Sequence, residues 1–217
     1  MEDSRPHIIL SAAISLDGKI ATKSGDSALS SRQDKVRVHR LRARSDAILV
    51  GKNTVNTDDP LLTVRHASGK NPTRIVLDSR ATILPNSKII KTAHLVPTII
   101  AISKNAPKKN LARLEKHPVK ILVVGKNRIN LKRLLQILYK QKIRTILLEG
   151  GGTTNWGFIR QGLVDEIIVT IAPYIAGGKE AKTLVEGDGF SKITGSLKLK
   201  LHKIKRQNNE IVLHYHS

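Results

Sequence analysis

Short apolar runs alternate with amphipathic stretches along this chain, and that alternation constrains the fold more than any other feature. Each apolar run is long enough for a buried strand and ends in polar or glycine residues. The predicted strands lie at residues 7–16, 47–50, 73–77, 97–102, 119–124, 143–148 and 165–172. Strands that alternate with helices favour a largely parallel sheet with helices on both faces.

Helices are predicted between several of these strands. Ser30 or Ser31 can cap a helix that ends near Arg44, although its apolar residues do not gather on one face. Asn130 can cap a second helix, and a short helix and a longer one are expected at 111–115 and 153–162. The helix after Asn130 carries its apolar residues on one face, namely Leu131, Leu134, Leu135 and Leu138.

The last part of the chain reads as a hairpin. Segments 197–204 and 210–215 flank the turn residues Gln207-Asn208-Asn209 and would add antiparallel strands at one sheet edge. No linker divides the 217 residues, and that length suits one domain. We therefore expect a single α/β domain over residues 1–217, with a mostly parallel central sheet flanked by helices and a C-terminal antiparallel hairpin.

Composition excludes several kinds of protein. The chain has no cysteine, so disulfides, thiolate metal sites and a cysteine nucleophile are ruled out, and no metal is expected. No run of about 18 apolar residues is present, so no membrane-spanning helix is predicted. Residues Met1 to Pro6 include Glu2 and Asp3 rather than the basic start of a secretory signal. These features favour a cytoplasmic protein.

The net charge of +21 would attract anions, including nucleic acid and phosphorylated metabolites. The basic residues are spread along the chain, which is typical of a solvated surface. Nucleic-acid binding is the alternative from a different functional class. Base stacking needs aromatic side chains among the basic ones, and only 3% of the residues are aromatic. We therefore expect no specific nucleic-acid partner.

Parallel sheets bind ligands beyond the carboxyl ends of their strands, where polar residues follow the apolar runs. Glu149, Gly150-Gly151-Gly152 and Thr153-Thr154 follow the strand at 143–148 and precede a helix. Without Cβ atoms the backbone can approach a phosphate, and a helix start favours an anion. A plain tight turn is as good an explanation of a glycine run alone. Glu149 would either hydrogen-bond an amino or hydroxyl group of a ligand or face solvent.

A second polar segment runs from Gly51 to Arg65. If its first turn is helical, Thr54 and Asp58 face the same side. Asp58 or Asp59 could instead simply cap a turn before Pro60, and for either residue taken alone that interpretation is favoured. Arg65 is either a surface charge or a phosphate ligand, for which its planar guanidinium is suited.

These segments belong to a set of motifs that follow one another along the chain. They read SAAISLDGKIAT, GDSALSS, RARSDAILVGKNTVNTDDPLLTVR, RIVLDS and LLEGGGTTNWGFIRQGLVDEIIVTIAPYIAGG. Over roughly residues 7 to 215, the chain resembles the riboflavin-biosynthesis pyrimidine reductases. These include archaeal and fungal stand-alone enzymes and the C-terminal half of the bacterial bifunctional deaminase-reductase.

The resemblance implies a dihydrofolate-reductase-like fold, NADPH as cofactor and a homodimer. It implies that a phosphorylated ribosylaminopyrimidine is reduced at C1′ of its sugar to a ribitylamino product. The residues that it assigns to NADPH are Leu29, Thr54, Asp58, Ser79, Arg80, Gly150, Gly151, Gly152, Thr153 and Thr154. Leu29 stands where many bacterial relatives have tryptophan, which places any stacking role there in question.

The residues that the resemblance assigns to the substrate are Ser27, Arg42, Leu62, Arg65 and Glu149, with the arginines as candidates for the 5′-phosphate. Lys19 and Glu149 match polar residues near the sugar and base, and they are the catalytic candidates for ring opening or protonation.

The chemistry of the residues also favours NADPH over NADH. Ser79-Arg80 and Ser103-Lys104 follow strands, and a hydroxyl beside a cation suits a 2′-phosphate. The 2,5-diamino substrate is favoured over the deaminated 5-amino-uracil form, because the chain has neither the cysteines nor the length for a zinc deaminase domain. The deaminated substrate and another pterin or folate reduction on the same fold are the alternatives.

Overall fold

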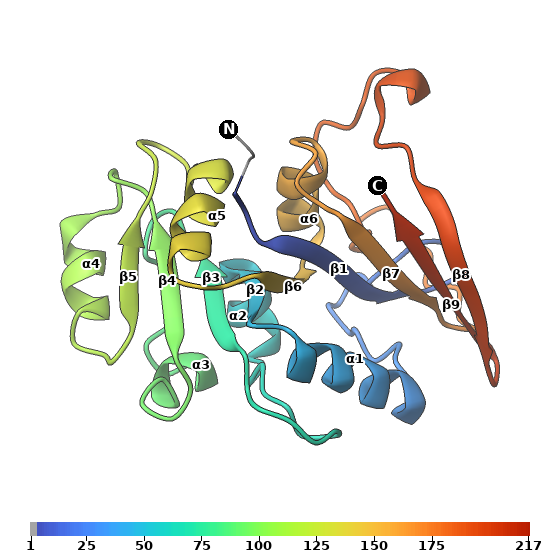
Figure 1. Ribbon diagram of the computed structural model, residues 1–217, viewed down its shortest axis with the longest axis horizontal. Helices are drawn as coiled ribbons and strands as arrows, with labels where there is room; N and C mark the ends of the chain where they lie inside the picture. The colour runs from blue at the N-terminus through green and yellow to red at the C-terminus, as the bar shows by residue number, and fades with distance from the viewer. Residues whose placement is uncertain (1–3) are drawn as a thin grey trace. The chain divides into compact units, whose positions relative to one another are not determined.

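The computed structural model describes residues 4–217 and has an α/β architecture (Figure 1). Hydrogen bonds join nine strands in the order β5-β4-β3-β2-β6-β1-β7-β9-β8. The strands are β1 (His7–Ile14), β2 (Ala47–Gly51), β3 (Thr73–Leu77), β4 (Thr98–Ile102), β5 (Lys120–Val123), β6 (Thr145–Gly150), β7 (Glu166–Ile171), β8 (Lys200–Gln207) and β9 (Glu210–His216). The predicted fold class, mostly parallel with an antiparallel C-terminal hairpin, is confirmed.

The helices are α1 (Arg32–Arg44), α2 (Lys52–Asp58), α3 (Lys88–Lys91), α4 (Lys108–Leu114), α5 (Leu131–Lys140) and α6 (Gly152–Ile159), and a 3₁₀ turn covers Ile193–Gly195. The segment after β2 is therefore helical. The four-residue helix α3 was not predicted, because it is too short to show a period. Among the described residues, no helix is both long and apolar enough to cross a membrane.

The chain divides into two compact units, each built from two segments. The first unit contains Met1–His7, of which the structure describes residues 4–7, and Arg40–Leu147. The second unit contains Ile8–His39 and Leu148–Ser217.

The first unit has four parallel strands, β2 to β5, with helices packed on an aliphatic core. Ile48, Val76 and Ile100 come from neighbouring strands and are fully buried. Helical residues complete the same cluster, among them Val55 of α2 and Leu114 of α4. Burying such a side chain contributes about 1.5–3 kcal/mol, so aliphatic packing accounts for the core without aromatic residues.

A buried guanidinium lies inside this unit. Arg74 of β3 is 0% exposed, and burial lowers its pKa to about 10. Its Nη2 donates to the carbonyls of Ile89 and Val96 at 3.0 and 3.1 Å, and its Nη1 donates to the carbonyl of Leu61 at 3.3 Å. The hydroxyls of Thr92 and Thr98 accept further bonds at 2.7–3.0 Å. Arg74 therefore links the segment before β3, helix α3 and the start of β4.

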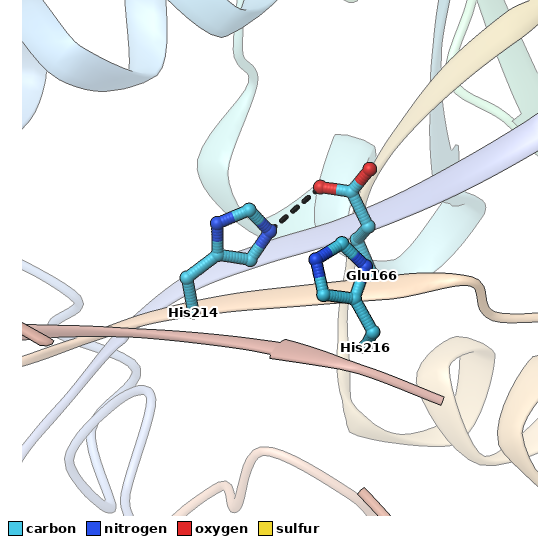
Figure 2. Close-up of side chains that lie close together, drawn as sticks. All are labelled: Glu166, His214 and His216. Atoms are coloured by element: carbon cyan, nitrogen blue, oxygen red, sulfur yellow. Dashed lines mark hydrogen bonds and ion pairs between the residues drawn. The ribbon is translucent and has the colours of Figure 1, made fainter. Parts of the chain in front are cut away.

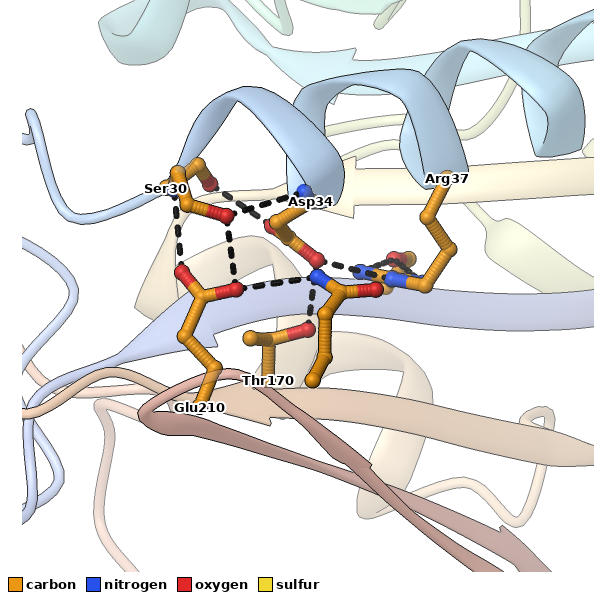
Figure 3. A network of polar contacts seen from close by, with 8 residues as sticks. Ser30, Asp34, Arg37, Thr170 and Glu210 are labelled. Carbon is orange, nitrogen blue, oxygen red and sulfur yellow. Dashed lines mark hydrogen bonds and ion pairs between the residues drawn. The ribbon is translucent and has the colours of Figure 1, made fainter.

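The second unit contains β1, β7, β8 and β9, with β7 parallel to β1 and antiparallel to β9. A polar network fastens the start of α1 to these strands (Figure 3). The Asp34 carboxylate is 0% exposed and accepts from Ser30 Oγ at 2.8 Å, Thr170 Oγ1 at 2.6 Å and Arg37 Nε at 2.8 Å. Each oxygen of this buried anion thus has a donor.

Of the two predicted cap residues, Ser30 and Ser31, it is Ser31 that caps α1. Its Oγ accepts from the Asp34 amide at 3.1 Å and donates to Glu210 Oε2 at 2.7 Å. The Ser31 amide donates to Glu210 Oε1 at 3.0 Å. The cap therefore ties the helix to the first residue of β9.

Asp17 connects the turn after β1 with the loop after β7. Its carboxylate accepts from Ser15 Oγ at 2.5 Å and from the amides of Ala176 and Gly177 at 3.0 and 2.7 Å. The bond from Ser15, followed by those from the two amides, lowers the pKa of Asp17 from 3.8 to about 2. The ionised carboxylate is thus the form that the fold stabilises.

Arg74→Met should lower the free energy of unfolding by about 3 kcal/mol or more, because it leaves buried carbonyls without donors. Urea denaturation followed by circular dichroism would measure this. Arg128→Met removes an exposed arginine and is the matched control. Equal stability of the two variants would show that Arg74 does not hold these segments.

Asp17→Asn should lower the melting temperature at neutral pH. Because folding lowers the pKa of Asp17, its ionised carboxylate contributes stability that is fully present above pH 3.8. That contribution is lost as the pH falls through about 2. The difference between the two proteins should therefore narrow over that window, as measured by melting curves at stepped pH. Asp188→Asn, at an exposed aspartate, is the control; a difference that stays constant down to pH 2 would contradict the assignment.

Candidate functional site

The predicted site residues fall into two groups, one in each unit. The second unit holds the glycine turn, Glu149, Lys19, Ser27 and Leu29, and the first unit holds the remaining residues.

The glycine turn joins β6 to α6, as the sequence predicts. Gly151 has φ +89°, a backbone conformation that side chains with a Cβ rarely adopt. A Cβ on Gly152 would lie 2.7 Å from the Thr183 carbonyl oxygen, and one on Gly150 would overlap the Asn155 side chain. Backbone conformation at Gly151, backbone and side-chain contacts at Gly152 and the Asn155 side chain at Gly150 thus each favour glycine.

The start of α6, directly beyond the turn, presents backbone N–H groups that have no acceptor within the helix. Helix α6 begins at Gly152, and the Asn155 amide donates to the Gly151 carbonyl at 3.0 Å. The amides of Gly152, Thr153 and Thr154 precede that first intrahelical bond, so their N–H groups have no helical acceptor. Together with the helix dipole, they favour a phosphate or another anion at this turn.

The segment 181–186 holds the glycine turn and Lys19 side by side. The Glu186 amide donates to the Gly152 carbonyl at 3.1 Å, and Asn155 Nδ2 donates to the Leu184 carbonyl at 2.8 Å. Lys19 forms an antiparallel bridge with Thr183, and its Nζ donates to the Ala181 carbonyl at 3.4 Å. This segment was not singled out in the sequence, since nothing in its local pattern shows what it contacts.

Asn155 is a further residue that sequence reasoning missed. It is 3% exposed, and within residues 4–217 its Oδ1 accepts no hydrogen bond. The same atom lies against Gly150. An unpaired buried acceptor next to the glycine turn fits a ligand that brings an N–H or O–H group there.

Glu149 is the penultimate residue of β6 and is half-buried directly before the turn. Its carboxylate therefore lies close along the chain to the anion-favouring amides, as predicted. Ser27 and Leu29 lie in the loop that precedes the α1 cap. The Leu29 amide donates to the Ser27 carbonyl at 2.8 Å, and Ser27 is exposed while Leu29 is partly buried.

In the first unit, Thr54 and Asp58 lie in α2, four residues apart on one helix face. The conditional prediction for this segment is thereby confirmed. Asp58 is the last residue of the helix, and it is Asp59, with φ 40°, that ends it. Partial desolvation raises the pKa of the Asp58 carboxyl above 3.8 although the residue stays exposed.

Arg42 and Arg65 are brought together at Thr63. Arg42 Nη1 donates to the Thr63 carbonyl at 3.1 Å, and Arg65 Nη1 contacts Thr63 Oγ1 at 3.4 Å. Leu62, next to them, is buried with φ 52°. Two guanidinium groups around one residue make a suitable site for a phosphate.

Ser79 and Arg80 follow β3, and the turn is tied to the end of β4. Ser103 donates from its amide and its Oγ to the Ser79 carbonyl at 3.1 and 2.8 Å. Asp78 also follows β3, but it is 1% exposed and accepts from the Ile83 amide at 2.6 Å. Its carboxylate is engaged inside the protein, so Ser79 and Arg80 are the side chains of this turn left for a ligand.

Each group suits a ligand within its own unit. In the second unit, the glycine turn suits a phosphate, and the unpaired Asn155 oxygen suits a donor group next to it. In the first unit, the Ser79-Arg80 turn suits a phosphate of its own.

Comparison with known proteins agrees with this chemistry. The model of the RibD C-terminal domain family matches residues 6–213. The 2,5-diamino-6-ribosylamino-4(3H)-pyrimidinone 5′-phosphate reductase of Methanothermobacter thermautotrophicus is 42% identical over 214 residues, covering 97% of this chain and 98% of the relative. The reductase of the same name from Aquifex aeolicus is 40% identical over 202 residues, covering 91% and 90%.

Solved structures agree on the fold. RibD from Acinetobacter baumannii superposes with a TM-score of 0.82 at 30% identity, covering 98% of this chain. This chain spans 58% of the length of that protein. The riboflavin biosynthesis reductase Rib7 of Saccharomyces cerevisiae has a TM-score of 0.75 at 23% identity, covering 98% of this chain and 90% of that protein. On the strength of the match over residues 6–213, this chain is an oxidoreductase that belongs to the RibD C-terminal domain family.

Proposed function

We propose that this chain reduces 2,5-diamino-6-ribosylamino-4(3H)-pyrimidinone 5′-phosphate to its ribitylamino product, with NADPH as the reductant. The observation that carries the proposal is the glycine turn before α6, in a chain 42% identical to a reductase of that name. The bound cofactor would supply a hydride to C1′ of the sugar. Every other role falls to residues of this chain.

We assign the cofactor to residues of both units. Gly150, Gly151, Gly152, Thr153 and Thr154 would hold the pyrophosphate through backbone amides and hydroxyls. Ser79 and Arg80 would bind the 2′-phosphate, which supports NADPH over NADH because Asp78 is engaged internally. Thr54, Asp58 and Leu29 would make the remaining cofactor contacts.

Arg42 and Arg65 would bind the 5′-phosphate of the substrate, since both reach Thr63. Ser27 and Leu62 would contact the rest of the substrate. Opening the ribose ring requires a proton on the ring oxygen as C1′ is reduced. Lys19 and Glu149 are the groups to which we assign the positioning of that proton, and alignment would account for most of the acceleration.

The proposal includes a single reductase domain, because the chain passes between the units and neither is one continuous segment. It also includes a cytoplasmic homodimer. Support for the dimer comes from the edge strand β8 and its neighbour β9, where Leu201, Ile204 and Ile211 are 45%, 59% and 44% exposed. Such apolar side chains are typical of a surface that another chain covers.

A second candidate function is reduction of the deaminated substrate. A solved structure from Thermotoga maritima named as a deaminase and 5-amino-6-(5-phosphoribosylamino)uracil reductase is 25% identical and covers 98% of this chain. That protein is longer, and this chain spans 56% of it. Both substrates share the ribosyl phosphate, so they differ only at the pyrimidine.

The direct test is NADPH oxidation, followed by absorbance, with the diamino substrate and its deaminated analogue side by side. We expect turnover with the diamino compound and a higher kcat/KM with NADPH than with NADH. Turnover with the analogue alone would establish the second candidate function instead. A folded protein that oxidises NADPH with neither compound would rule out both.

Gly151→Ala should raise the KM for NADPH about tenfold, because it moves the amides that precede α6. Gly162→Ala is the matched control: Gly162 also has positive φ, at +63°, but follows α6 and has no atom near its Cβ position. Both variants should lose stability, and only Gly151→Ala should change the KM. Equal KM values in steady-state kinetics would remove the glycine turn from the cofactor site.

A further inference from the structure

Three histidines and a glutamate gather on the C-terminal strands, and none of the four is among the residues assigned to the reductase. Glu166 of β7 pairs directly with His216 of β9, so the two side chains share a sheet face. His214 lies two residues before His216 and therefore on that face as well. Figure 2 shows the His214 imidazole hydrogen-bonded to the Glu166 carboxylate and the His216 ring next to the Glu166 side chain.

The distances suit a single metal ion. His214 Nε2 lies 2.7 Å from Glu166 Oε2, and the ligand atoms of Glu166, His214 and His216 all lie within 4.8 Å of one another. Nitrogen and oxygen ligands at about 2.0–2.1 Å from a tetrahedral Zn²⁺ are about 3.3 Å apart. The distances between the ligand atoms of the cluster, from 2.7 Å to no more than 4.8 Å, lie on both sides of that value. Small side-chain rotations would therefore bring the three atoms to bonding distance of one ion.

A third imidazole, that of His202, is next to these three ligands. The His202 ring centroid is 5.0 Å from that of His214 and 4.7 Å from that of His216. The register of the β8–β9 pairing shifts between Leu201 and Lys203, so His202 lies at a β-bulge. Such a bulge redirects a side chain. Here it places an exposed imidazole beside the cluster.

The ligand chemistry selects the class of metal. Imidazole nitrogen suits Zn²⁺ and neighbouring transition metals, whereas Mg²⁺ and Ca²⁺ require several oxygen ligands. Only one carboxylate belongs to the cluster, and Lys200 and Lys203 flank His202 in the sequence. The positive charges of these two lysines repel a cation, so electrostatic attraction alone would not hold one here. Binding must come from the metal–nitrogen bonds.

We propose that Glu166, His214 and His216 bind one Zn²⁺ per chain, with His202 positioned to complete a tetrahedral site. The ion would join β7 and β9, and through His202 also β8. The sequence was expected to bind no metal because it has no cysteine. That absence rules out thiolate ligands only and leaves imidazole ligands possible. The proposal is independent of the reductase activity, because none of its residues is assigned to that site.

Isothermal titration of the chelator-treated, untagged full chain with ZnCl₂ tests the proposal. We expect saturation at one Zn²⁺ per chain and a higher melting temperature with the metal. His214→Ala and Glu166→Gln should each weaken binding at least about tenfold. His94→Ala, at an exposed histidine of the first unit, is the matched control and should bind as the unaltered chain does.

Substitution with Co²⁺ adds a readout of geometry, since a tetrahedral site gives intense visible absorption bands. Circular dichroism without metal establishes that each variant folds, and His216→Ala replaces any variant that does not. No saturable binding, one ion per two chains, or undiminished binding in the folded variants would each overturn the proposal.

Discussion

The buried carboxylate of Asp34 governs how the second unit is arranged. A buried charge without partners would cost several kcal/mol, so its donors must be in place whenever the unit is folded. Thr170 supplies one of them and joins α1 to β7, and Arg37, one turn along α1 itself, supplies another. Ser30 and Ser31 bind Asp34 and Glu210 directly after the loop that carries Ser27 and Leu29. The loop proposed to meet the ligands is thus anchored by polar contacts at its end.

In the first unit, the buried Arg74 guanidinium has the role that the Asp34 carboxylate has in the second: its hydrogen bonds fix neighbouring segments. Its bond to the Leu61 carbonyl fixes the chain just before Leu62 and Thr63. Thr63 is the residue that Arg42 and Arg65 both contact. In each unit, then, a buried charged side chain holds the segment on which candidate ligand residues lie. Apolar packing supplies most of the stability, and these polar contacts determine which conformation the connecting segments take.

Most strands and helices could be predicted from the sequence because apolar periodicity and cap residues are local properties. Asn130 caps α5 as expected, with its Oδ1 accepting from the Arg133 amide at 3.0 Å. Arg74 could not be recognised in this way, since a strand arginine has no local mark of burial. The contact of Gly152 with segment 181–186 joins residues about thirty apart, and the histidine cluster depends on strand register. The glycine turn was identified, whereas the reason for each glycine needed the structure.

The interleaving of the two units bears on how the chain is made. Asp34 is synthesised 136 residues before Thr170, and Ser31 179 residues before Glu210. At about 5–20 residues per second, the first of these gaps lasts roughly 7–27 s on a ribosome. During that interval α1 lacks both the Thr170 hydroxyl that donates to its buried Asp34 and the Glu210 carboxylate that binds its cap residue. The first unit, which includes the end of α1, lies before Leu148, so its core has the chance to form before the start of α1 can contact β7 and β9.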